Sequence, residues 1–390
     1  MQLSDRDRQL LLPEVSPEML RPEFWCKRFP DLELDADWIG TVGLPSEPTI
    51  ESYINNINQL GNLYNEDGSP LALEKTIERS AWWNRPEYGL LTEAGDLKLL
   101  PREEPLFSCK GKSNFDRNQL SGLDPGDQVN LFGRSADGNW FGVISDTGIG
   151  WVKQNIVGTG TKNEVQAYQN EQPRLVLIDP DAIILWEGGT ISASMGCSFP
   201  LNDHFRRTIV FPRRNHQRKS IYKTGIIIGE TVRDHLPQTT HHLIRQAFKY
   251  LGYRYAWGDR DPKGFGRDCS RLVKDVLRSI GFRPPRNSRE QLAAGKKRIT
   301  LAGMNTTERL NRLKAVPPGS LLFTAGHVMF YLGEYRGEVY AIHALSGYKQ
   351  ISNNMEEPVK VNQVVVSGLS LGLGTNAGSL LEQLTEVIEV

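Results

Sequence analysis

The sequence has little cysteine, and the cysteines that it has are widely spaced. Cys26, Cys109, Cys197 and Cys269 are spread over 390 residues and form no Cys-x-x-Cys pair. A structural zinc site is typically formed by closely spaced pairs of cysteines and histidines, and a disulfide framework is typical of short chains that are rich in cysteine. The sequence therefore indicates neither, and we expect no metal site and no cofactor.

Long apolar runs and an excess of charge of one sign are missing as well. No run approaches the roughly twenty apolar residues of a membrane-spanning helix, so we expect no membrane span. Lysine plus arginine equals aspartate plus glutamate, 46 against 46, so no overall field favours nucleic acid or an anionic membrane as partner. Residues 1–15 lack the basic-then-apolar pattern of a signal peptide. As written, the sequence predicts a cytoplasmic protein, with the periplasm or cell envelope as the alternative.

What the sequence does have is a cysteine at the start of a predicted helix. Apolar residues recur at helical spacing directly after Asp268-Cys269-Ser270, namely Leu272, Val273, Val276, Leu277 and Ile280. Asp268 is a good N-cap, and the unpaired N–H groups of a first helical turn favour a thiolate over a thiol. Cys269 is therefore a candidate nucleophile. The alternative is a small buried residue where the helix packs on a sheet.

Two histidines follow on neighbouring predicted strands. His327 lies in the β-rich run 326–333 and His343 in the run 339–344, with a turn between them. In papain-like chemistry a cysteine at a helix start precedes a histidine on a strand, and a third polar residue on the next strand orients that histidine. The order predicts Cys269 as nucleophile, His327 as base and His343 as the orienting residue.

The residues around these three resemble a known family. Five short segments carry the resemblance in order and spacing: Tyr255-Ala256-Trp257-Gly258, Arg267-Asp268-Cys269-Ser270, Pro285-Arg286-Asn287-Ser288, Gly326-His327 and Ile342-His343. They look like the signature of the NlpC-type cell-wall peptidases, which are bacterial papain-like murein endopeptidases. The resemblance covers about the last third of the chain and implies an α+β fold there. That family often has glycine after Cys-Ser, whereas this chain has Arg271, whose spacing allows a place on the solvent face of the helix.

The rest of the chain divides into three further regions, so we expect a multidomain protein. Residues 1–85, interrupted by prolines, predict a mostly helical N-terminal segment with helices at 46–60 and 74–83 and with Trp25 and Trp38 as packing anchors. Short alternating runs separated by turn signals predict two all-β regions, 86–160 and 161–230. Both resemble the bacterial SH3 domains that accompany these peptidases, which implies two SH3-like barrels. Residues 231–390 form the predicted peptidase domain, with helices at 241–251 and 378–390.

The resemblance also implies a substrate. A helical arm, two SH3-like modules and this catalytic domain are similar to the endopeptidases that cut between γ-D-glutamate and the diamino acid of peptidoglycan stem peptides. The positions of Tyr255, Asp268 and Ser270 correspond to residues that hold the free L-alanine amine there. A carboxylate beside a phenol and a hydroxyl is a suitable ammonium site. Asp268 cannot fully serve as both helix cap and ammonium partner, so a purely structural role for it stays open.

The functional prediction is thus a monomeric cysteine peptidase that acts on stem peptides or muropeptides and has no nucleic-acid partner. Two alternatives belong to other classes. One is a non-catalytic wall-binding protein, and the other is an acyltransferase or amidase that uses the same cysteine on another acyl group.

Overall fold

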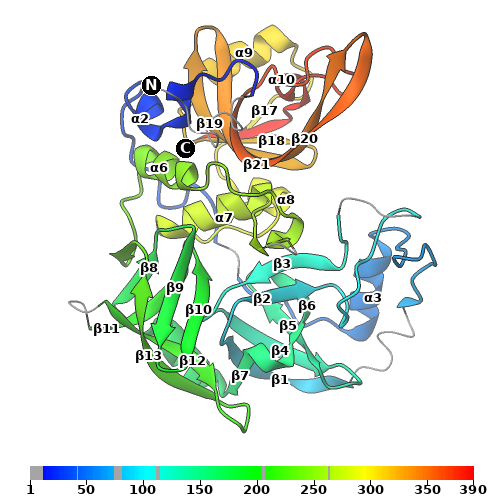
Figure 1. Ribbon diagram of the computed structural model, residues 1–390, viewed down its shortest axis with the longest axis vertical. Helices are drawn as coiled ribbons and strands as arrows, with labels where there is room; N and C mark the ends of the chain where they lie inside the picture. The colour runs from blue at the N-terminus through cyan, green and yellow to red at the C-terminus, as the bar shows by residue number, and fades with distance from the viewer. Residues whose placement is uncertain (1–11, 42, 74–80, 111–114, 204–206, 262–263) are drawn as a thin grey trace. The chain divides into compact units, whose positions relative to one another are not determined.

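The computed structural model describes residues 12–41, 43–73, 81–110, 115–203, 207–261 and 264–390. These residues are mostly β structure with few helices, and they belong to two compact units (Figure 1). One unit combines residues 1–42 with residues 235–390, and the other is formed by residues 43–234. The N-terminal segment predicted over residues 1–85 is therefore divided between the two units.

The first unit is built on an antiparallel sheet. In its described residues the sheet has six strands in the order β17-β22-β18-β19-β20-β21. The strands are β17 (Arg298–Thr300), β18 (Leu321–Thr324), β19 (His327–Tyr335), β20 (Glu338–Ser352), β21 (Met355–Gly368) and β22 (Glu386–Ile388). A short hairpin is formed by β15 (Arg260–Asp261) and β16 (Gly264–Phe265). Because β19, β20 and β21 are consecutive neighbours, residues on one face of this meander can meet across three strands.

Helices flank this sheet, and the predicted helix after Asp268 is confirmed. They are α6 (Thr240–Lys249), α7 (Cys269–Ser279), α8 (Ser288–Ala294), α9 (Thr306–Lys314) and α10 (Leu380–Gln383). The Asp268 side chain accepts a hydrogen bond from the Arg271 N–H and caps α7. The five apolar residues of its predicted stripe are all buried. α6 and α7 lie side by side against the sheet, and α7 packs on β19 and β20 (Figure 1).

The predicted C-terminal helix over 378–390 is wrong. The chain is helical only through α10, and β22 then pairs with both β17 and β18. Val387 and Ile388 are completely buried in this pairing. Tertiary strand pairing, which the local sequence does not reveal, decides the conformation here.

The N-terminal arm of the first unit is anchored by its tryptophans, as the sequence suggested. It contains the short helices η1 (Pro17–Leu20) and α2 (Pro22–Cys26). Trp25 is buried, contacts the ring of Tyr340 and donates a hydrogen bond to the Met19 carbonyl. Trp38 is also buried and meets Phe282 edge to face. These contacts attach the arm to β20 through Tyr340 and to the segment after α7 through Phe282.

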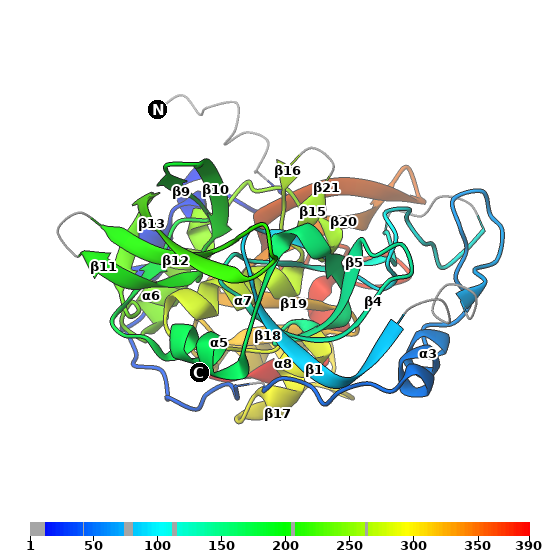
Figure 2. The same ribbon diagram turned by 90° about the horizontal axis from the view of Figure 1, so that it is seen from below.

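The second unit contains two antiparallel sheets. The first has seven strands among the described residues: β1 (Ala81–Leu91), β2 (Gly95–Lys98), β3 (Gln119–Leu123), β4 (Gln128–Arg134), β5 (Trp140–Ser145), β6 (Gly148–Lys153) and β7 (Val157–Gly160). α3 (Ile50–Asn58) lies beside this sheet and contributes Tyr53 and Ile57 to its core (Figure 1 and Figure 2). The helix predicted over 46–60 is confirmed. Of the helix predicted over 74–83, residues 74–80 lie outside the described part and residues 81–83 begin β1 instead.

The second sheet also has seven described strands. They are β8 (Arg174–Leu177), β9 (Asp181–Trp186), β10 (Gly189–Ser194), β11 (Ser198–Asp203), β12 (Thr208–Arg214), β13 (Ser220–Ile228) and β14 (Thr231–Arg233). A helix that the sequence analysis missed, α5 (Lys162–Asn170), precedes it. Thr161 and Glu164 form a capping box at its start, and this spacing could have indicated the helix. That the two sheets are SH3-like barrels stays a prediction.

Among the described residues no helix is long and apolar enough to cross a membrane.

Candidate active site

Cys269 is the first residue of α7 and is buried between this helix and the start of β19. Its side chain lies against the backbone N–H of Val328, the residue directly after His327, and this N–H stabilises the thiolate. The structure therefore puts the sulfur at the end of the strand that carries the first histidine. Its own backbone N–H belongs to the first helical turn, where N–H groups have no acceptor within the helix.

Burial changes the expected ionisation of this thiol. The loss of solvent, together with the neighbouring Asp268 carboxylate, raises the pKa of Cys269 to about 12. The backbone N–H of Val328 on β19, the charge of Arg286 and the backbone N–H of Ser270 at the helix start all lower this pKa, but they are outweighed. The sequence predicted a thiolate from the helix start alone. It could not show that the capping carboxylate and the protein interior both oppose that charge.

The two predicted histidines meet on the sheet. Nε2 of His327 lies 2.7 Å from Nδ1 of His343, and the rings are nearly perpendicular. Burial lowers the pKa of His327 to about 4, and burial together with His327 holds the pKa of His343 well below its usual value. Both imidazoles are therefore neutral near pH 7. Since Nε2 of His327 is used by His343, Nδ1 is the nitrogen left to receive a thiol proton.

A third residue of this row was missed by the sequence analysis. Oγ of Ser367, on β21, lies 2.9 Å from Nε2 of His343. Ser367 is paired with Ala341, two residues before His343 on β20. Nothing in the sequence around Ser367 marks it, because its neighbour is set by the strand register.

The predicted amine-binding residues surround the cysteine. Tyr255 is half-buried, and burial and the charges of Asp268 and Cys269 raise its pKa far above the ordinary value, so its hydroxyl lies near both. The hydroxyl of Ser270 donates to Oδ1 of Asp268 over 3.2 Å. The structure thus brings Tyr255, Asp268 and Ser270 together.

Asp268 has, however, a cationic partner that the sequence analysis did not identify. Arg286 donates to its two carboxylate oxygens, over 3.1 Å to Oδ1 and 2.6 Å to Oδ2. Asp268 also accepts from the N–H groups of Arg271 and Gly258. Arg286 holds the pKa of Asp268 below its usual value although burial opposes this. The carboxylate is therefore ionised and already paired.

The expectation that Arg271 faces solvent is wrong. It is buried and donates to Asp275 over 2.6 Å and to Asp259 over 3.2 Å. Asp259 in turn accepts from Arg286 over 3.2 Å. A charged residue can be buried here because carboxylates from two segments face it. The sequence offered a hint, since Arg271 and Asp275 are four residues apart on one helix.

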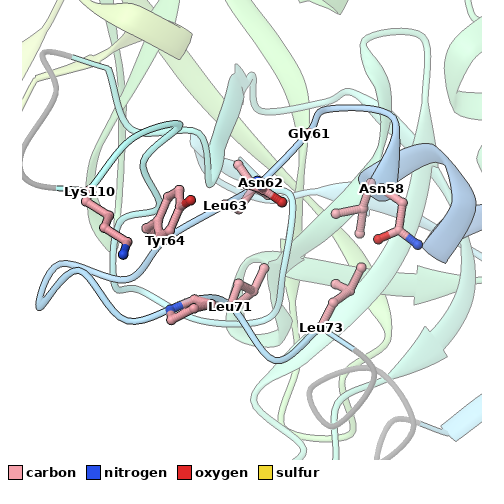
Figure 3. A pocket seen from close by; sticks show the side chains of 10 residues that line it. Asn58, Gly61, Asn62, Leu63, Tyr64, Leu71, Leu73 and Lys110 are labelled. Carbon is pink, nitrogen blue, oxygen red and sulfur yellow. The ribbon is translucent and has the colours of Figure 1, made fainter.

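No group of three or more histidine, cysteine, aspartate or glutamate side chains among the described residues could hold a metal ion. A pocket of about 370 Å³ lies in the second unit, where Asn62, Tyr64, Leu71, Leu73 and Lys110 line it (Figure 3). It contains none of the predicted site residues.

The comparison with protein families matches the part of the chain that contains these residues. Residues 252–367 match the model of the NlpC/P60 family. This segment, which is less than half of the chain, is similar to the NlpC/P60 family. It includes Cys269, His327, His343 and the three predicted amine-binding residues, and the match supports a cysteine-type peptidase.

Individual relatives match over the same part of the chain. The probable endopeptidase p60 of Listeria innocua is 32% identical over 102 residues, which are 26% of this chain and 19% of that protein. The bifunctional muramidase/DL-endopeptidase CwlT of Bacillus subtilis is 31% identical over 96 residues, which are 25% of this chain and 23% of that protein. The chain thus spans about a fifth of the length of these curated relatives.

The fold is shared over a longer range. The structure of an NlpC/P60 endopeptidase from Photobacterium damselae subsp. piscicida superposes with a TM-score of 0.74 at 17% identity. The match covers 90% of this chain and 88% of that one. At this identity the likeness concerns the fold alone.

Proposed function

We propose that this chain is a cysteine peptidase that hydrolyses the bond between γ-D-glutamate and the diamino acid of peptidoglycan stem peptides. The observation that supports a peptidase reaction is the position of the buried Cys269 thiol. It lies at the start of α7, next to the strand that carries His327, and His327 is hydrogen-bonded to His343. The NlpC/P60 match and the names of the relatives support a cell-wall peptide as substrate.

The first chemical step is the attack of Cys269 on the amide carbonyl. Because the free site holds a neutral thiol and a neutral imidazole, the thiol proton moves to Nδ1 of His327 as the sulfur bonds to the carbonyl carbon. The charge that develops on the carbonyl oxygen is stabilised by the backbone N–H of Cys269, which points out of the helix end. His343 holds the ring of His327 in place during this transfer.

The second half of the reaction releases both products. His327 gives its proton to the leaving amine of the diamino acid, and an acyl-enzyme remains on Cys269. His327, neutral again, then takes a proton from water while the water oxygen attacks the thioester. The sulfur leaves and is protonated, and the γ-glutamyl carboxylate is released.

We further propose that Tyr255, Asp268 and Ser270 recognise the free amine of L-alanine. Asp268 already accepts from Arg286, so an entering ammonium group must replace a donor or share an oxygen. The Ser270 hydroxyl is the donor most easily exchanged, because its O–H can turn away from Asp268 while its oxygen, which already accepts from Arg286, accepts a second hydrogen bond from the amine. A substrate without a charged amine would displace a donor from Asp268 and supply no hydrogen bond in its place.

Product analysis on defined peptides tests the proposal. L-Ala-γ-D-Glu-diamino acid peptides should be cut between the second and third residues. Peptides acetylated at the L-alanine amine, or still joined there to N-acetylmuramic acid, should react at least about a hundredfold more slowly, because a charged group in the site loses its partner. Asp268→Asn should remove much of this discrimination, and equal digestion of intact sacculi and free tripeptide would refute the amine site.

The same experiments separate the two alternative functions. A wall-binding protein without catalysis would bind sacculi but release no new amine from the defined peptide. An acyltransferase would transfer the glutamyl group to an added amine acceptor in place of water, and an amidase would cut a different bond. Mass spectrometry of the products distinguishes all three.

A further inference from the structure

A serine on the third strand completes the row of side chains that begins at His327. Ser367 is fully buried on β21, and its Oγ lies 2.9 Å from Nε2 of His343. Nδ1 of His343 lies 2.7 Å from Nε2 of His327. The three side chains therefore form one chain of hydrogen bonds across β19, β20 and β21.

The sheet itself sets this row. His343 is paired with Val365 across the two strands, and Ser367 is paired with Ala341. Since side chains two residues apart lie on the same face of a strand, Ser367 is the diagonal neighbour of His343. The hydroxyl is thus held by the strand register and not by a loop.

Which group donates and which accepts in each hydrogen bond of this row decides whether His327 can act as a base. If Ser367 donated to Nε2 of His343, then His343 would donate from Nδ1 to Nε2 of His327, and His327 would carry its proton on Nδ1. That tautomer cannot receive the thiol proton at Nδ1. In the opposite direction each imidazole carries its proton on Nε2, and Nδ1 of His327 keeps a free lone pair.

The charged intermediate allows only the second direction. Once His327 has accepted the thiol proton, both of its nitrogens carry protons, so Nε2 must donate to Nδ1 of His343. His343 stays neutral because it is buried next to this charge. Its proton is then on Nε2 and points to the oxygen of Ser367.

We propose that Ser367 is a positioning residue, which accepts a hydrogen bond from His343 and thereby holds His327 in the tautomer that can take the proton of Cys269. The inference deepens the proposed function and rests on it, because a base is needed only if Cys269 is the nucleophile. Without the serine oxygen, the buried Nε2–H of His343 loses its acceptor, and the opposite tautomers become more populated.

Nitrogen NMR of the histidine rings in the full-length protein tests the tautomers without reference to activity. In the wild type, His327 and His343 should both carry their proton on Nε2. Ser367→Ala should shift both rings toward Nδ1–H, and Ser367→Thr, which restores a hydroxyl, should return them. Ser279→Ala is the matched control, since it removes a buried serine hydroxyl that donates to the Val276 carbonyl in the same unit.

Kinetics on the free tripeptide give the second readout. Ser367→Ala should lower kcat by about tenfold or more and leave KM nearly unchanged, because substrate binding is untouched and only the competent tautomer is depleted. Ser279→Ala should keep the wild-type kcat. Nδ1–H on His327 of the wild type, or ring spectra that Ser367→Ala does not alter, would overturn the inference. A wild type that cuts no stem peptide would refute the proposed function, while the spectra would still decide the role of Ser367.

Discussion

Replacement of the buried Arg271 by methionine should strongly destabilise the region around α7. Arg271 is one of three arginines that alternate with three aspartates in a buried network: Arg267, Asp275, Arg271, Asp259, Arg286 and Asp268. Its guanidinium lies 2.6 Å from Asp275 and 3.2 Å from Asp259, and all three side chains are at most 4% exposed. Methionine keeps most of the side-chain volume but leaves the network with one uncompensated negative charge.

The expected cost follows from what each carboxylate retains. Breaking a buried ion pair by removing one partner typically costs about 3–5 kcal/mol. Asp275 still has Arg267 and the Tyr250 hydroxyl, and Asp259 still has Arg286. We therefore expect the lower end of that range, about 3 kcal/mol. This corresponds to a rise of about a hundredfold in the equilibrium constant for local opening of α7.

Hydrogen exchange of the α7 amides, followed by mass spectrometry in the full-length protein, measures this opening. The matched control is Arg298→Met, which removes an arginine paired with Glu386 at the surface of the same unit, where Arg298 is 43% exposed. An exposed pair contributes about 0–1 kcal/mol, so exchange of α7 should hardly change in the control. If Arg271→Met altered the opening free energy of α7 by no more than the control, the buried network would not stabilise this helix.

Three further predictions concern the site. Cys269→Ala should lower turnover by on the order of a thousandfold, whereas Cys197→Ser should keep most of it, and equal activity of the two variants would exclude the cysteine mechanism. Iodoacetamide should modify the exposed Cys109 much faster than the buried Cys269 at pH 7, because burial raises the pKa of Cys269 to about 12. Peptide mapping measures the two rates, and faster labelling of Cys269 would show that the free site holds a thiolate. The free energy of unfolding should fall as the pH is lowered from about 6.5 to about 4, because His327 and His343 become protonated in the unfolded chain but stay neutral in the folded protein, with about 3 kcal/mol from His327 alone. Urea unfolding at a series of pH values checks this, and His327→Gln should flatten the dependence.

The sequence predicted the local parts of the site well. The apolar stripe after Asp268 predicted α7, and the β-rich runs 326–333 and 339–344 predicted β19 and the first part of β20, because helix caps, helical spacing and strand signals are properties of a few consecutive residues. The order of one cysteine and two histidines along the chain then sufficed to suggest their roles. The fold of the C-terminal end was not accessible in this way, since β22 forms only by pairing with β17 and β18.

The candidate site residues and their order along the chain could thus be proposed from the sequence itself. Their electrostatic surroundings were decided by the tertiary structure. Arg271 is buried and Asp268 is paired with Arg286 because segments that are separate in sequence meet there. The contact of Ser367 with His343 is set by the register of two strands. Burial and charge pairing depend on which segments meet, and so the ionisation of Cys269 and the tautomer of His327 follow from the assembled sheet and helix rather than from their neighbours in the chain.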